Sequence, residues 1–252
     1  MDRSLAKGLA KAAILMADVD PNQEDPGTKR VSIGNMKGRK RFIDSSVNEY
    51  KASGRFLGAA ARNEFKHTVI VHYGVIDLSP SRTLLAIFND VFWIGGKKNS
   101  YDVRHEPHML VAAIEQHALE RIAQRKGERE LADFLETLKP VWSWCDAMNK
   151  SRFQGRFYIP VKDGIFCCFR GSPSAHFKDR RDPTLYEVSD EFHFTRIRTF
   201  ISRDRLRGGY VGLWEKLDSA VRAASAPRCP SFRRLTPEQR HAVEIMTTAR
   251  PE

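Results

Sequence analysis

Long hydrophobic segments and paired cysteines are both missing from this sequence. No run of about 18 apolar residues occurs, which excludes a transmembrane helix. A disulfide framework or a zinc site would need clustered or suitably spaced cysteines, and the 4 cysteines include no C-x-x-C pair. We therefore expect buried, reduced thiols in a cytoplasmic protein that does not associate with membranes. The cysteines are Cys145, Cys167, Cys168 and Cys229.

The short motifs that identify common enzyme classes are missing as well. There is no G-x-x-x-x-G-K-[ST] loop, no H-E-x-x-H, no G-x-S-x-G and no G-x-G-x-x-G after a strand. Phosphate-loop NTPases, zincins, α/β-hydrolases and dinucleotide-binding folds are therefore poor candidates. We expect no cofactor and no metal site.

Acidic residues are too few to balance the basic ones. The 252 residues include 42 Lys and Arg but only 31 Asp and Glu, which gives a net charge of +11. Such an excess is typical of a protein that binds a polyanion, and it indicates a nucleic-acid partner. The basic residues gather in two regions, 29–41 and 196–207. The predicted nucleic-acid contacts are Arg39, Lys40, Arg41, Lys178, Arg180, Arg181, Arg196 and Arg198.

The chain divides into an N-terminal arm and a larger body. Residues 1–41 predict a short amphipathic surface helix followed, over 18–41, by a basic linker rich in glycine and proline. Residues 42–252 predict a single α+β domain, and an internal boundary near 96–107 stays open.

Within the body, helical patterns come first and strand patterns follow. Helical spacing occurs over 44–65 and, after Pro107, over 107–126, while 128–148 predicts another helix that Pro140 breaks or kinks. Alternation predicts a strand over 67–79, whereas 83–96 fits either a buried helix or a strand.

The second half begins with alternating residues. A hairpin is predicted over 152–171, and a strand that could contain a bulge over 192–202. Two further helices follow, the last opened by Thr236-Pro237-Glu238. Helices followed by an antiparallel sheet define an α+β fold rather than an alternating α/β fold.

One helical segment combines residues that can carry chemistry. His117, Arg121 and Arg125 are spaced four apart, so they follow one side of a helix, with Glu120 and Gln124 beside them. An imidazole can transfer a proton near neutral pH, and guanidinium groups bind phosphate. This row would suit metal-independent cleavage of RNA, in which the 2′-hydroxyl attacks the phosphate. The alternative is a surface helix with ordinary ion pairs.

This segment, H-A-L-E-R-x-x-x-R-x-G, resembles the helix that precedes a small antiparallel sheet in RelE/BrnT-like ribonuclease toxins, a grouping similar to barnase. The matching residues are His117, Ala118, Arg121, Arg125 and Gly127. The resemblance implies ribonuclease activity. It covers one helix well and the later strands loosely, and it does not reach residues 1–106.

The strand over 192–202 would supply further site residues. Strict alternation would put Arg196 and Arg198 on one face and Thr195, Ile197 and Thr199 on the other. Barnase-like folds place basic and hydroxyl residues on such strands, so by that analogy Thr199 joins the predicted catalytic set. That set is His117, Glu120, Arg121, Arg125 and Thr199.

The leading hypothesis is a ribonuclease-like protein that acts on RNA rather than DNA. His117 would transfer the proton and the arginines would hold the phosphate. Two alternatives stay open. One is a non-catalytic nucleic-acid-binding accessory or regulatory protein of phage or plasmid type. The other is a protein-interaction module, a homodimer or a complex with a cognate protein, built on Trp142, Trp144 and the C-terminal helices.

Overall fold

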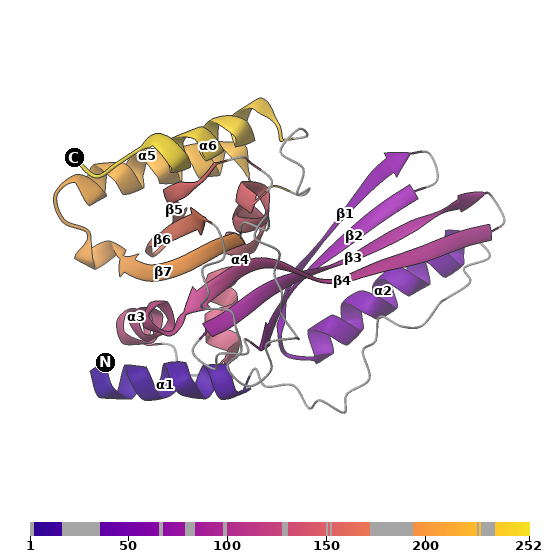
Figure 1. Ribbon diagram of the computed structural model, residues 1–252, viewed down its shortest axis with the longest axis horizontal. Helices are drawn as coiled ribbons and strands as arrows, with labels where there is room; N and C mark the ends of the chain where they lie inside the picture. Colours follow the sequence, from indigo (N-terminus) through magenta and orange to yellow (C-terminus); the bar gives the residue numbers. More distant parts are fainter. Residues whose placement is uncertain are drawn as a thin grey trace.

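The computed structural model describes residues 3–16, 36–65, 68–78, 84–97, 100–127, 131–149, 151, 153–171, 194–225, 227 and 235–252. Within these ranges the chain forms α-helices around one seven-stranded sheet (Figure 1). The helices are α1 (Arg3–Met16), α2 (Met36–Ala52), α3 (Gln116–Lys126), α4 (Leu131–Asn149), η3 (Arg203–Arg205, a 3-10 turn), α5 (Gly209–Ala224) and α6 (Pro237–Thr248). The strands are β1 (Phe56–Phe65), β2 (Thr68–Leu78), β3 (Leu84–Lys97), β4 (Ser100–Glu115), β5 (Gly155–Val161), β6 (Gly164–Gly171) and β7 (Phe194–Ser202).

The sheet has the strand order β1-β2-β3-β4-β7-β6-β5. Every neighbouring pair is antiparallel except β4 and β7, which run parallel over Ala112–Ile114 and Thr195–Ile197. This confirms the predicted α+β class. In the described part of the chain, no helix has the length and apolar character needed to cross a bilayer.

The register of the strands shows on which face of the sheet Arg196 lies. Tyr50 of α2 packs against Ala86 of β3. Ala86 pairs with Ala113 of β4, and Ala113 pairs with Arg196 of β7. Because paired residues point to the same side, Arg196 lies on the face that carries α2. Arg196 binds Glu115 at the end of β4, so this carboxylate lies on the face that carries α2 as well.

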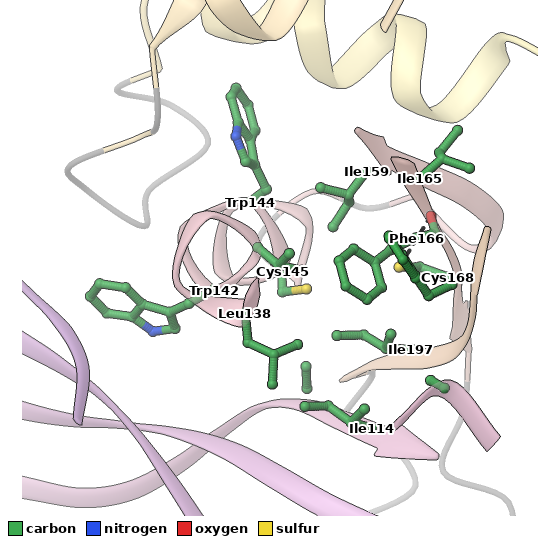
Figure 2. Packing of buried hydrophobic residues seen from close by; sticks show 14 of the residues in the cluster. Ile114, Leu138, Trp142, Trp144, Cys145, Ile159, Ile165, Phe166, Cys168 and Ile197 are labelled. Atoms are coloured by element: carbon green, nitrogen blue, oxygen red, sulfur yellow. Dashed lines mark hydrogen bonds between the residues drawn. The ribbon is translucent and has the colours of Figure 1, made fainter. Parts of the chain in front are cut away.

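The opposite face carries α4 and the main hydrophobic core. Figure 2 shows Trp142 and Trp144 leaving α4 on different sides, Trp142 toward the strands and Trp144 toward the C-terminal helices. Both side chains are buried, at 7% and 1% exposure. The two tryptophans therefore belong to the core, and they do not offer the exposed interface that the protein-interaction hypothesis requires.

Trp142 fits this core because two strands leave room for it. A Cβ on Gly74 of β2 would lie 2.5 Å from the indole, and one on Gly58 of β1 would lie 3.1 Å from it. The indole N–H donates a hydrogen bond to the buried side chain of Asn89 on β3. The two glycines on adjacent strands thus leave the space that the Trp142 side chain occupies.

The predicted helix over 107–126 is wrong in its first half. Residues Ser100–Glu115 form β4, and the helix begins only at Gln116. The prediction treated Pro107 as a helix start, but proline also occurs in strands at bulges. The register with β3 slips here, since Asn89 pairs with Met109 and Val91 with Glu106. Pro107 lies in the unpaired stretch, where its missing N–H costs no ladder bond.

Two other boundaries were wrong. The helical pattern over 44–65 ends at Ala52, where Ser53 and Gly54 form a turn, and Phe56–Phe65 is β1. Gly54 has a φ of 68°, a conformation that glycine adopts without strain. The predicted linker over 18–41 is also too long, because its last six residues already belong to α2. The rest of that linker lies outside the described residues.

Most of the remaining elements are confirmed. The strand over 67–79, the helix over 128–148, the hairpin over 152–171 and the N-terminal helix all occur, and 83–96 is a strand. Pro140 stays inside α4. Thr236 caps α6 in a capping box with Gln239. However, four strands precede α3, so the described elements do not run strictly from helices to sheet.

Candidate nucleic-acid interface

Five arginines from three elements come together beside α3. We call this group the α3–β7 arginine surface: Arg121, Arg125, Arg196, Arg198 and Arg205. Glu115 links Arg196 and Arg198 to the start of α3, and Arg125 anchors the other end of the helix to β7. Because a helix rises 1.5 Å per residue, these two ends are separated by about 15 Å.

The helix α3 is fixed by burial on one side and by its C-terminal cap. Ala118, Leu119, Ile122 and Ala123 are fully buried. The helix ends at Gly127, whose left-handed φ of 75° lets its amide donate to the carbonyl of Ala123. With this apolar side against the protein, His117 and Arg121 lie away from the core.

His117 is accessible, and its contacts among the described residues are with its own helix. Its side chain is 47% exposed, and its Nδ1 lies 3.9 Å from Oε2 of Glu120. The Nε of Arg121 donates to its Nε2 at 3.4 Å, which fits a neutral imidazole whose proton is on Nδ1. Glu120 is held in turn by the amide of Gln116 at 2.8 Å.

Arg121 and Arg125 differ in how firmly they are held. Arg121 also donates to Oε1 of Gln124 at 2.9 Å, whereas Arg125 donates to the backbone carbonyl of Phe200 in β7. Burial lowers the pKa of Arg125, and the charges of Arg121 and Arg205 lower it further, against the opposing effect of Asp204. Three positive charges therefore act on one another at this end of α3, and Asp204, which lies 3.6 Å from Arg205, offsets part of them.

Glu115 organises the other end of the surface. Its Oε1 accepts a hydrogen bond from Arg196 at 2.8 Å and lies 3.7 Å from Nε of Arg198. All three side chains are partly solvent-exposed. The ion pair holds two guanidinium groups beside the first turn of α3 while leaving part of each open to a ligand.

The predicted face of Thr199 was wrong, and the reason is a bulge in β7. Ile197 pairs with Cys168 and Thr199 pairs with Cys167, so Arg198 is an extra residue without a partner in β6. Adjacent cysteines point to opposite faces, and therefore Ile197 and Thr199 do as well. The bulge moves Thr199 to the face of Arg196. The charge of Arg125 acts on Cys167, the partner of Thr199, which brings this strand position close to α3.

The structure gathers only part of the predicted nucleic-acid contacts. Arg196 and Arg198 join the α3–β7 arginine surface, while Lys40 and Arg41 are exposed on α2. Arg39 lies in α2, and Lys178, Arg180 and Arg181 lie outside the described residues. Arg205 was not among the predicted site residues, although its place in the run Ser202-Arg203-Asp204-Arg205 was a signal.

No three histidine, cysteine, aspartate or glutamate side chains of the described residues gather as a metal site would require. The described cysteines are free thiols; Cys145 and Cys168 are buried and Cys167 is partly buried. Comparison with protein-family models, with curated proteins and with solved structures found no match for this chain. The chemistry of the surface must therefore be judged from its own geometry.

Proposed function

We propose that this protein binds RNA along the α3–β7 arginine surface and cleaves it there with His117. The observation that carries the proposal is the exposed His117 imidazole, flanked by Glu120 at 3.9 Å and by Arg121 at 3.4 Å, at the edge of five arginines.

Binding would depend on the charges of the surface. Guanidinium groups form bidentate, charge-assisted hydrogen bonds with phosphate, and the arginines extend over about 15 Å. That length is enough to contact more than one phosphate of an RNA chain. Glu115 and Asp204 are the acidic groups recorded beside these arginines.

Cleavage would use the 2′-hydroxyl of RNA as the nucleophile. The 2′-oxygen bonds to phosphorus while the bond from phosphorus to the 5′-oxygen breaks, leaving a 2′,3′-cyclic phosphate. His117 would accept the 2′-hydroxyl proton on Nε2, and water would supply a proton to the departing 5′-oxygen. Phosphate would draw Arg121 away from Nε2, which frees the base and stabilises the charge on phosphate oxygens. Glu120 would orient the imidazole and stabilise its charged form.

The chain contains a matched control for this proposal. His241 of α6 lies 3.9 Å from Glu244, three residues later, as His117 does from Glu120. Both side chains of the pair on α6 are exposed, and the pair repeats the histidine–glutamate distance away from α3. Any activity that depends on the arginine surface should follow His117 and not His241.

The test is incubation with RNA in the presence of a chelator, followed by analysis of product ends. We expect wild-type protein to form 2′,3′-cyclic phosphate ends. His117→Ala should lower the rate by at least about 100-fold, the usual contribution of acid–base catalysis, and His241→Ala should not change it. Intact RNA after incubation with wild-type protein, or full activity of His117→Ala, would overturn the assignment of cleavage to His117.

One observation favours a second candidate, RNA binding without cleavage. Both nitrogens of His117 face groups of its own helix, and Glu115 already occupies Arg196. Such pairs are also what a purely electrostatic binding surface would have. Binding that weakens steeply with salt, without any product, would support this candidate.

A further inference from the structure

A second basic surface lies on α2, away from α3. Lys37, Arg39, Lys40 and Arg41 fall within the first six residues of this helix, and its first turn contains no acidic residue. The side chains of Lys40 and Arg41 are exposed. We call Lys40 and Arg41 the α2 basic surface.

The packing of α2 fixes where this surface lies. The ring of Phe42 contacts that of Phe92, with centroids 5.6 Å apart, while Tyr50 packs against Ala86 and Phe88. The helix therefore runs opposite to β3, and its first residues lie beyond Phe92, toward the far end of the β3–β4 hairpin.

The separation between the two basic surfaces follows from β4. Phe92 pairs with His105, ten residues before Glu115, which holds Arg196. Because β4 contains extra residues at its bulges, the span is counted on β3, where Phe92 lies eight residues from Leu84, the partner of Glu115. At about 3.4 Å per residue, the two surfaces are about 27 Å apart along the sheet. They lie on the same face of the sheet, and β4 extends along the length of the molecule (Figure 1).

The position of these cations on α2 is unfavourable for the helix itself. The N-terminal end of a helix carries a partial positive charge, so lysine and arginine there cost stability instead of adding it. A bound polyanion would offset this repulsion. The α2 basic surface thus fits a ligand better than it fits a role in folding.

We propose that the α2 basic surface is a second contact for the same RNA, and that the two surfaces together select an RNA with a helical stem. The inference rests on the proposed function. A stem is a stiff rod that holds phosphates at both surfaces at once, and known domains that bind duplex RNA by shape span about 16 base pairs. Two linked contacts strengthen binding only when one ligand reaches both.

The test compares RNA hairpins with stems of about 6 and about 18 base pairs, together with a single strand of the longer length. Affinity is measured at several salt concentrations with wild-type protein and with Lys40→Gln/Arg41→Gln. Lys51→Gln is the matched control, because Lys51 is an exposed lysine in the last turn of the same helix. We expect the long stem to bind at least about tenfold more tightly than the short stem.

The double variant should reduce long-stem affinity to that of the short stem, and it should flatten the salt dependence by about two units. The double variant should leave short-stem binding and thermal stability intact or slightly improved.

Equal wild-type affinity for both stems, or equal weakening of both by the variant, would overturn the second contact while leaving the proposed function standing. Equal binding of the single strand would overturn the selection of stems. Failure of wild-type protein to bind any of the RNAs would overturn the proposed function and this inference together.

Discussion

Glu115 and Arg196 form an ion pair of 2.8 Å that joins the end of β4 to β7 at the point where α3 begins. The same carboxylate lies 3.7 Å from Arg198. A carboxylate in this position has two opposing effects. It holds two guanidinium groups in place, and it repels the phosphate that those groups would otherwise bind.

We expect Glu115→Gln to strengthen RNA binding by about two- to fivefold, because the amide keeps a hydrogen-bond acceptor but removes the negative charge. The salt dependence should become steeper by about one unit, since one more guanidinium is free to contact phosphate. Folding stability should change by less than about 1 kcal/mol, as the pair is partly exposed.

Binding titrations at several salt concentrations would measure this effect, with Glu244→Gln on α6 as the control. Weaker binding by Glu115→Gln would contradict the prediction. It would mean that the carboxylate serves to position the arginines and that its repulsion of phosphate is minor.

Local patterns in the sequence predicted those elements that have clear strand, turn or capping signals. Strand β2 is rich in β-branched residues, Asp163-Gly164 supplies the turn of the hairpin β5–β6, and α6 has a capping box at Thr236. By contrast, β4 contains His105, Pro107 and His108, and its last residues read equally well as a helix. This segment is a strand because it pairs with β3, and that pairing joins residues far apart in sequence.

The candidate site shows the same division. The row of His117, Arg121 and Arg125 follows from helical spacing, and the structure places all three on α3. Glu115 could not be assigned as the partner of Arg196, because their contact depends on the parallel pairing of β4 with β7. Likewise, the bulge at Arg198 is a property of two strands together, so sequence alone could not put Thr199 on the arginine face.

Replacing Gly74 by alanine should destabilise the protein by about 1–3 kcal/mol, because the new methyl group would overlap the indole of Trp142. Gly212 of α5 provides the control. A Cβ there meets nothing within 4 Å, so Gly212→Ala should stabilise the protein by about 0.5–1 kcal/mol through a better helix propensity. Denaturant unfolding would measure both. Unchanged stability of Gly74→Ala would contradict the prediction, because it would show that the Trp142 indole can shift to make room for the methyl group.

Arg170 is a buried cation whose recorded hydrogen bonds go to backbone carbonyls. It is 5% exposed, and it donates to the carbonyls of Asn149, at the end of α4, and Phe153. Burial lowers its pKa. Arg170→Met should cost about 2–3 kcal/mol, since two partly buried carbonyls lose their donor.

Arg222→Met on α5 is the matched control for this substitution. Arg222 is 69% exposed and pairs with Asp218 at 2.7 Å, so its loss should cost less than about 0.5 kcal/mol. Unfolding free energies of the two variants would be compared at one pH. Similar values would contradict a structural role for Arg170 at the end of α4.

The described thiols should be protected from alkylation in the folded protein. Burial raises the pKa of Cys145 and Cys168, and it raises that of Cys167 to about 11 although Arg125 acts in the opposite direction. Against an ordinary value of about 9, the thiolate of Cys167 at pH 8 is reduced about 100-fold. Mass spectrometry after iodoacetamide treatment would measure the alkylation of each described thiol. The experiment uses a Cys229→Ser background, because Cys229 lies outside the described residues.

The same shift predicts how stability depends on pH. Because the pKa of Cys167 is higher in the folded protein than in the unfolded chain, the folded state holds the thiol proton more tightly. Its contribution is intact below about pH 9 and is lost as the pH rises toward about 11. Denaturant unfolding at pH 8 and pH 10 should therefore show a smaller loss of stability for Cys167→Ser, whose hydroxyl does not titrate, than for the parent protein. An equal loss in both proteins would contradict the assignment of the raised pKa to this thiol.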